Sequence, residues 1–331
     1  MAVTTIGGQA RRQADKIAAD SLTGRGFDFG GKLFEAVIAL ALFTSLLILS
    51  VLLIDVVSDG WDQLSTRLGA FLNGTLRSRS EDGQLGVHQG LYGSLWIGIM
   101  VAVIAFPMGV AAALYLEEYA HKSRVTNLVQ LAIRNLAGVP SVVYGLLGLF
   151  LFVGRNKLFG FIGLDWLVDL TGGSSVISAG LTLSILVLPI VIITSQEAIR
   201  AVPSGLKEGA YGLGATKSDM IRRQILPYAA PGILTGTLLS MSRAIGEAAP
   251  LILVGAISGG LTRNPALMDT SGLDERFTAL PIVIVTWVQQ RGRDAGFGTA
   301  AAAAIVVLLV LVLLLNLAAI LLRNRFEKRR G

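Results

Sequence analysis

Glu208-Gly-Ala-Tyr-Gly-Leu-Gly-Ala-Thr-Lys217, which continues to Ile225-Leu-Pro227, is a polar interruption between two hydrophobic segments of membrane length. Its glycines and lysine raise the question of a phosphate-binding loop. A P-loop requires glycine directly before Lys-Ser/Thr, and Thr216 holds that place. A dinucleotide-binding fingerprint requires a third glycine where Lys217 stands. The stretch therefore contains neither nucleotide motif, and its place between two spans indicates a polytopic membrane protein.

The composition supports the same class. Of the 331 residues, 53% are hydrophobic and 15% are charged, whereas about a quarter of the residues in a soluble domain are charged. The chain has no cysteine, and its two histidines, His88 and His121, lie far apart in the sequence. We therefore expect no disulfide, no metal site and no catalytic residue. The high pI, near 9.8, is better explained by membrane topology than by nucleic-acid binding.

Six hydrophobic segments have about the length that a helix needs to cross a bilayer, roughly 20 residues at 1.5 Å each. We therefore predict an all-α integral membrane fold with six transmembrane helices. The predicted spans are 33–54, 91–116, 126–153, 176–194, 229–256 and 297–322.

The basic residues predict the orientation. Most Lys and Arg residues fall in the two tails and in the loops on the same side as the tails, which places both termini in the cytoplasm. The predicted organisation is then a cytoplasmic tail (1–32), a first transmembrane helix with an extracytoplasmic loop (33–90), a core (91–322) that contains the cytoplasmic loop 195–228, and a basic cytoplasmic tail (323–331).

The 195–228 loop is longer than an ordinary connection, and long ordered loops are often functional. Pro203-Ser204 precedes a predicted short helix from Gly205 to Leu213, with Ser204 as its N-cap. Small residues at 209, 210, 212 and 214 would let this helix lie close against a partner. Composition alone leaves a solvated loop as the alternative.

Three charged residues lie inside predicted spans, where they usually face a protein interior or an aqueous path. Arg243 and Glu247 are four residues apart and are expected to pair, while Arg134 would leave an excess positive charge near an anion. Pro140 predicts a break after which a half-helix offers the free N–H groups of its first turn, including that of Ser141. The alternatives are an ion pair that only joins helices and a proline kink that only shapes packing.

The cytoplasmic loop resembles the EAA loop of ABC importer permeases, whose pattern is Glu-Ala-Ala, three residues, Gly, nine residues and Ile-x-Leu-Pro. The residues that match in register are Glu208, Ala210, Gly214, Leu226 and Pro227, whereas Gly209 and Gln224 depart from the pattern. The flanks, Gly138-Val-Pro-Ser-Val-Val-Tyr-Gly145 and Ser242-Arg-Ala-Ile-Gly-Glu-Ala-Ala-Pro-Leu251, are similar to those of the PstA-type permease family of bacterial phosphate importers.

This resemblance implies a type I (MetI-like) permease in the bacterial inner membrane. It implies that the subunit forms half of a phosphate path and binds no cofactor, because ATP and Mg²⁺ belong to a partner ATPase dimer. The other implied partners are a second permease, an extracytoplasmic phosphate-binding protein and membrane lipid. The implied coupling residues are Glu208, Gly209, Ala210, Gly214, Leu226 and Pro227, and the expected path residues are Arg134, Ser141, Arg243 and Glu247. Three alternatives stay open: a sulfate-type oxyanion permease, the paired phosphate permease, and a secondary anion transporter.

Overall fold

A computed structural model describes residues 29–76, 85–154, 165–261 and 263–327, and every regular element among these residues is helical. The chain divides into two compact units, residues 1–55 and 56–331. Helix α2 (Phe29–Asn73) begins in the first unit, where its side chains are exposed, and continues into the second. The predicted tail 1–32 lies outside the described residues up to position 28, and its last four residues already belong to α2.

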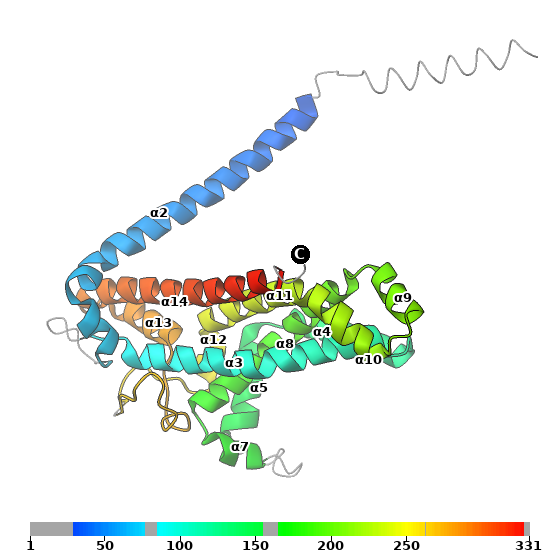
Figure 1. Ribbon diagram of the computed structural model, residues 1–331. Helices are drawn as coiled ribbons and strands as arrows, with labels where there is room; N and C mark the ends of the chain where they lie inside the picture. The colour runs from blue at the N-terminus through cyan, green and yellow to red at the C-terminus, as the bar shows by residue number, and fades with distance from the viewer. Residues whose placement is uncertain (1–28, 77–84, 155–164, 262, 328–331) are drawn as a thin grey trace, which may run out of the picture. The chain divides into compact units, whose positions relative to one another are not determined.

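The second unit holds the remaining elements (Figure 1). They are α3 (His88–Leu114), a π-helical turn (Tyr115–Tyr119), α4 (Arg124–Ala137), α5 (Ser141–Gly148), a π-helical turn (Leu149–Val153), α7 (Asp165–Thr171), α8 (Val176–Arg200), α9 (Ser204–Gly212), α10 (Lys217–Met220), a π-helical turn (Ile221–Ile225), α11 (Leu226–Gly246), α12 (Ala249–Leu253), α13 (Leu280–Gln290) and α14 (Gly296–Glu327).

Helix α8 is the centre of this unit and packs against α3, α4, α5 and α11. Small residues allow the close approach, because a Cβ added at Gly109 would lie 2.6 Å from Val191 of α8, and one added at Gly236 would lie 2.5 Å from Thr194. Between membrane helices, where lipid is as apolar as the side chains, such close contact supplies much of the packing energy. Residues such as Leu183 and Val187 are fully buried at this centre.

The six predicted spans correspond to a less regular set of helices. By length and apolar composition, four described helices can cross a membrane, namely those that contain α2, α3, α8 and α14. The predicted third span is a pair, α4 and α5, bent by 101°. The predicted fifth span ends at Gly246 rather than near residue 256, and its helix, α11, carries Arg243 and four serine and threonine residues that lower its apolarity. The break in the third span was predicted, and the sharpness of its bend was not.

Two predicted loops are largely helical. Residues 56–73 belong to α2, which is kinked at Arg67, although their polar composition indicated a loop. Tertiary packing explains the difference, because Gly60 lies against the backbone of Ala303 and Phe71 packs on Trp287. In the predicted loop 195–228, the first residues complete α8, and residues 217–228 run as helical turns into α11. Within this predicted loop, the chain is non-helical only at 201–203 and 213–216.

The predicted basic tail also begins as helix. Helix α14 extends to Glu327, past the predicted end of the last span at residue 322. Residues 328–331 lie outside the described residues. In the second unit, α9 and α10 lie at one end, and the loop between α12 and α13 lies at the other (Figure 1).

Candidate functional site

The break between α4 and α5 is a defined structure rather than a simple kink. Helix α4 ends at Ala137 with Gly138 as its C-cap, and α5 begins at Ser141 after Pro140. Tyr144, 6% exposed, donates a hydrogen bond of 2.8 Å from its hydroxyl to the Leu136 carbonyl across the break. Among the described residues no side chain caps the start of α5, and the Val143 N–H donates to the Pro140 carbonyl, so the N–H groups of Ser141 and Val142 are those that can bind an anion.

A second break lies directly against the first. Helix α11 ends at Gly246, Glu247 is extended, and α12 begins at Ala249. Helices α5 and α12 pack together, and a Cβ added at Gly145 would lie 2.7 Å from Pro250 Cα and 2.9 Å from Leu253 Cδ1. Two interrupted helices from distant parts of the chain therefore meet, an arrangement that exposes helix ends for ligand binding in membrane transporters.

Gly145→Ala is expected to destabilise this contact by about 1–3 kcal/mol, because the added methyl group meets the backbone of Pro250, which cannot move aside as the Leu253 side chain can. Gly138→Ala is the matched control, since its Cβ would meet only Asn135 O of its own turn at 3.5 Å. Thermal unfolding of the purified protein in detergent measures the difference. Equal unfolding temperatures for the two variants would contradict the close packing of α5 on α12.

The predicted Arg243–Glu247 pair is present. Arg243 Nε lies 3.3 Å from Glu247 Oε1, with the Arg243 side chain 61% exposed and that of Glu247 19% exposed. Next to them, Ser242 donates a hydrogen bond of 2.5 Å to Oδ1 of Asn316, which joins α11 to α14. Within the described part of the chain, the hydrogen bond of Arg243 is made by Nε, and the side chain is largely exposed, so the forked Nη1 and Nη2 groups remain available to bind an oxyanion bidentately.

The structure does not join Arg134 to this pair. Arg134 is exposed in the last turn of α4, an amphipathic helix with no buried residue. No hydrogen bond or ion pair between described residues connects it to Arg243 or Glu247. The expected meeting of two positive charges with one negative charge is therefore not seen within this chain. It stays a prediction for the assembled transporter.

The predicted coupling residues divide between two elements. Glu208 and Gly209 are exposed on α9, and Ala210 of the same helix packs on the buried cluster that contains Met220 and Ile225. Leu226 packs on this cluster too, and with Pro227 it begins α11. Helix α9 starts at Ser204, so Pro203 rather than the predicted Ser204 is its N-cap. Ala210 and Leu226 therefore share one apolar base, through which α9 contacts the segment that leads into α11.

The turn after α9 carries a feature that the sequence did not single out. Leu213 is 92% exposed, and it borders a groove of about 290 Å³ that is also lined by Gly214, Asp219 and Arg223. Thr216, the residue that excluded a P-loop, caps α10 by accepting a hydrogen bond from the Asp219 N–H. The Thr216 hydroxyl also holds the pKa of Asp219 below its usual range. Leu206 and Tyr211 of α9 are exposed as well, and exposed apolar side chains that gather on one surface can mark a protein-binding site.

Gly214 provides the backbone conformation of this turn. Its φ is +78°, and no atom lies within 4 Å of an added Cβ. Gly214→Val is therefore expected to disturb the turn through the backbone alone, at a cost of about 1–2 kcal/mol, and to reposition Leu213. Gly214→Asn is the control, because asparagine tolerates this conformation and fills the same open space. Protease cleavage at the turn should rise for the valine variant only; equal cleavage would contradict this role for Gly214.

Charged contacts connect the end of α3 to this region. Glu117 accepts hydrogen bonds of 2.6 and 2.9 Å from Arg200 and of 2.9 Å from Gln196. Glu118 pairs with Lys207 of α9 at 2.6 Å, and Lys217 Nζ lies 4.7 Å from the ring centroid of Tyr119. Glu117 and Glu118 were not among the site residues predicted from the sequence. They lie on the predicted cytoplasmic side, and the next predicted cytoplasmic loop, 195–228, carries basic residues. This pairing of opposite charges is the signal that could have indicated the contacts.

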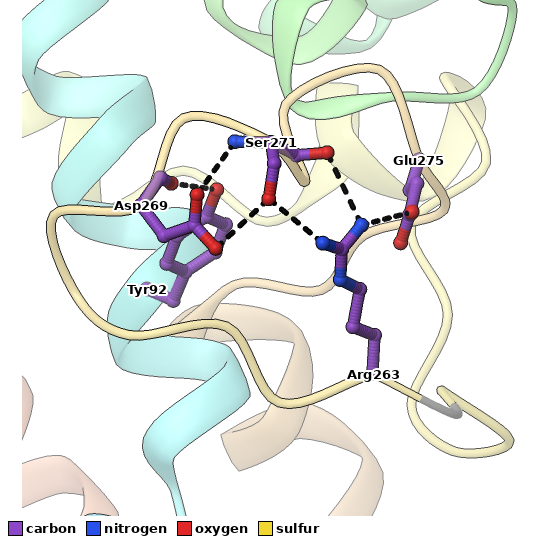
Figure 2. A network of polar contacts seen from close by, with 5 residues as sticks. All are labelled: Tyr92, Arg263, Asp269, Ser271 and Glu275. Carbon is purple, nitrogen blue, oxygen red and sulfur yellow. Dashed lines mark hydrogen bonds and ion pairs between the residues drawn. The ribbon is translucent and has the colours of Figure 1, made fainter.

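At the other end of the unit, the loop between α12 and α13 is held to α3 by side chains (Figure 2). Arg263 pairs with Glu275 at 2.7 Å and donates to the Ser271 hydroxyl at 2.8 Å, and Tyr92 donates to the Asp269 carbonyl at 2.7 Å. Hydrogen bonds from Ser271, its N–H first and then its hydroxyl, hold the pKa of Asp269 below its usual range. The loop is therefore an ordered cap on the end of α3, beside a cavity of about 200 Å³.

Comparisons with known proteins place these features in a family. Residues 90–330 match the family described as binding-protein-dependent transport system inner membrane component. The chain is 37% identical over 204 residues to the phosphate transport system permease protein PstA of Mycobacterium leprae, covering 61% of this chain and 59% of the relative. It is 30% identical over 237 residues to the phosphate transport system permease protein PstC 2 of Mycobacterium bovis, covering 68% and 73%. The chain thus spans about three fifths of the length of its PstA relatives.

Solved structures confirm the predicted permease fold. A chain of the crystal structure of a bacterial alginate ABC transporter, in complex with an alginate pentasaccharide-bound periplasmic protein, matches with a TM-score of 0.59 and 18% identity, covering 87% of this chain and 92% of that chain. A second alginate importer structure matches with a TM-score of 0.58 and 17% identity, covering 95% and 99%. The likeness extends over nearly the whole length of both structures.

Proposed function

Because this chain belongs to the family of binding-protein-dependent transport system inner membrane components, we propose that it is a permease subunit of an ATP-driven importer of inorganic phosphate. The observation that carries the proposal is its similarity, at 30–37% identity, to relatives named phosphate transport system permeases of both the PstA and the PstC type. The chain is then a multi-pass protein of the bacterial inner membrane with both termini in the cytoplasm, which the distribution of basic residues supports.

The translocation path in this proposal runs past the paired helix breaks. The first turn of α5, with Ser141 at its start, offers N–H donors and the positive end of a helix dipole. Arg243 offers two unused guanidinium nitrogens from the adjoining break. Arg134 of one permease would face the path once a second permease completes it. Together these groups suit a tetrahedral anion, which binds forked and converging donors.

Glu247 favours phosphate over sulfate in this path. A carboxylate repels a fully ionised oxyanion, whereas it accepts a hydrogen bond from one that still carries a proton, as phosphate does near neutral pH. Its side chain is 19% exposed and points to Arg243, so it lies beside the proposed donors. A sulfate-type permease would gain nothing from a carboxylate at this position.

The partners follow from the two ends of the second unit. We propose that α9, α10 and Leu213 dock on an ATPase dimer, which binds ATP and Mg²⁺, and that Glu208, Gly209, Ala210, Gly214, Leu226 and Pro227 form or support that surface. The ordered loop at the other end would meet an extracytoplasmic phosphate-binding protein. The chain itself binds no cofactor and performs no catalysis in this scheme.

Affinity purification of the tagged chain from its native membrane tests the assignment. Mass spectrometry is expected to identify an ATPase and a second permease in stoichiometric amounts. Recovery of the chain alone, under detergent conditions that keep a reference ABC importer intact, would overturn the proposed assembly.

A further inference from the structure

The turn Tyr115–Tyr119 at the end of α3 contacts α8, α9 and α10. Three consecutive residues take part: Glu117 binds Arg200 of α8, Glu118 binds Lys207 of α9, and the Tyr119 ring lies under Lys217 of α10. The turn is π-helical, a geometry that is rare and is often found at functional positions. One short element thus contacts all three helices around the proposed ATPase-binding surface.

The Glu118–Lys207 pair is the most enclosed of these contacts. The Glu118 side chain is 8% exposed and that of Lys207 is 29% exposed, with 2.6 Å between the charged atoms. A carboxylate that is so far removed from water is costly unless a partner stays in place. The pair therefore favours a state in which α9 and the end of α3 remain together.

Helix α9 has few other attachments. None of its residues is buried, and Ala210 is its member that packs on the apolar cluster beneath. The connections on its two sides are short, and one contains Gly214 with its positive φ. Without the ion pair, α9 could move while α3 stays still.

Helix α3 leads from this turn to the opposite end of the unit. Over its 27 residues, about 40 Å, it packs along α8. Its first turns hold the loop between α12 and α13 through His88 to the Pro265 carbonyl, Tyr92 to Asp269 and Trp96 to the Leu267 carbonyl, at 2.7–3.0 Å. A displacement of α3 would therefore reach that loop.

We propose that Glu118 and Lys207 are positioning residues that join the coupling helix α9 to α3, so that closure of the ATPase is passed to α3 as well as along the covalent route through α8 and α11. The inference rests on the proposed function, because it requires an ATPase on α9. It assigns α3 as the element that carries the movement to the far loop.

The test uses the complete transporter in lipid nanodiscs or proteoliposomes and measures both ATP hydrolysis and labelled phosphate uptake. Glu118→Gln keeps the size of the side chain and its hydrogen-bonding ability, and Lys207→Gln changes the more exposed partner. Each variant is expected to keep the ATPase subunits bound but to import at least about fivefold less phosphate per ATP hydrolysed. A fivefold change corresponds to the lower end of typical coupling energies. The charge swap Glu118→Lys with Lys207→Glu should recover part of this ratio.

An unchanged ratio of phosphate to ATP in both single variants would overturn the inference, and so would a charge swap no better than either single variant. Loss of the ATPase from the complex in the single variants would also overturn it, because the pair would then serve docking rather than transmission. Leu213→Asp distinguishes a failure of this inference from a failure of the proposed function. If that variant releases the ATPase while the pair variants behave as wild type, only the inference fails; if wild type shows no ATP-driven uptake, the proposed function fails.

Discussion

Leu213→Asp is expected to release the ATPase from this permease and to abolish phosphate uptake. Leu213 is 92% exposed in the isolated chain, beside the groove formed with Gly214 and Asp219. Burial of a leucine side chain in an interface contributes about 2 kcal/mol, which corresponds to a roughly 30-fold change in affinity. A buried, unpaired carboxylate adds a further cost. Pull-down of the ATPase by the tagged permease measures the effect.

The matched control for this prediction is Leu213→Met, which preserves apolar volume and should retain the ATPase. Both variants should reach the membrane in equal amounts, because the exposed residue contributes nothing to the packing of the chain. Retention of the ATPase by the aspartate variant would show that the docking surface lies elsewhere on the permease.

Arg243→Ala is expected to lower phosphate uptake by at least about tenfold. A charge-assisted hydrogen bond contributes about 1.5–3 kcal/mol, and each 1.4 kcal/mol corresponds to a factor of ten. Arg243→Lys keeps the charge but loses the forked geometry, so its uptake should be intermediate. Initial rates of labelled phosphate uptake, corrected for the amount of transporter in the membrane, measure both variants.

A double variant separates phosphate binding from simple charge neutralisation. Arg243 is paired with Glu247 at 3.3 Å, so its removal also leaves a carboxylate without its partner. Arg243→Ala combined with Glu247→Gln removes both charges. Uptake should stay low if Arg243 binds the anion, whereas recovery to the wild-type rate would show that it only neutralises Glu247.

The fold class could be predicted because it depends on lengths of apolar sequence and on one motif. The four helices that can cross a membrane, the break at Pro140 and the Arg243–Glu247 pair all follow from local spacing along the chain. The helical state of residues 56–73 could not be predicted in this way, because contacts with Ala303 and Trp287, more than 200 residues away in sequence, stabilise it.

The same distinction applies to the candidate site. The EAA register drew attention to residues 208–214, but Leu213 is an ordinary apolar residue in the sequence and only its exposure makes it notable. Glu118 and Lys207 are 89 residues apart, and the meeting of Gly145 with Pro250 likewise depends on how α5 and α12 fold together. Local patterns indicated the coupling loop and the Arg243–Glu247 pair, whereas the contacts between distant segments depend on tertiary structure.

The proposed function requires that this chain transports phosphate in a process driven by ATP hydrolysis on its partner ATPase. Labelled phosphate uptake into proteoliposomes that contain the purified complex and its binding protein tests it most directly, with ATP enclosed and the proton gradient collapsed by an ionophore. We expect uptake to continue under these conditions, to require hydrolysable ATP and to resist competition by excess sulfate. Uptake that survives without ATP but stops when the proton gradient collapses would identify a secondary transporter and contradict the account.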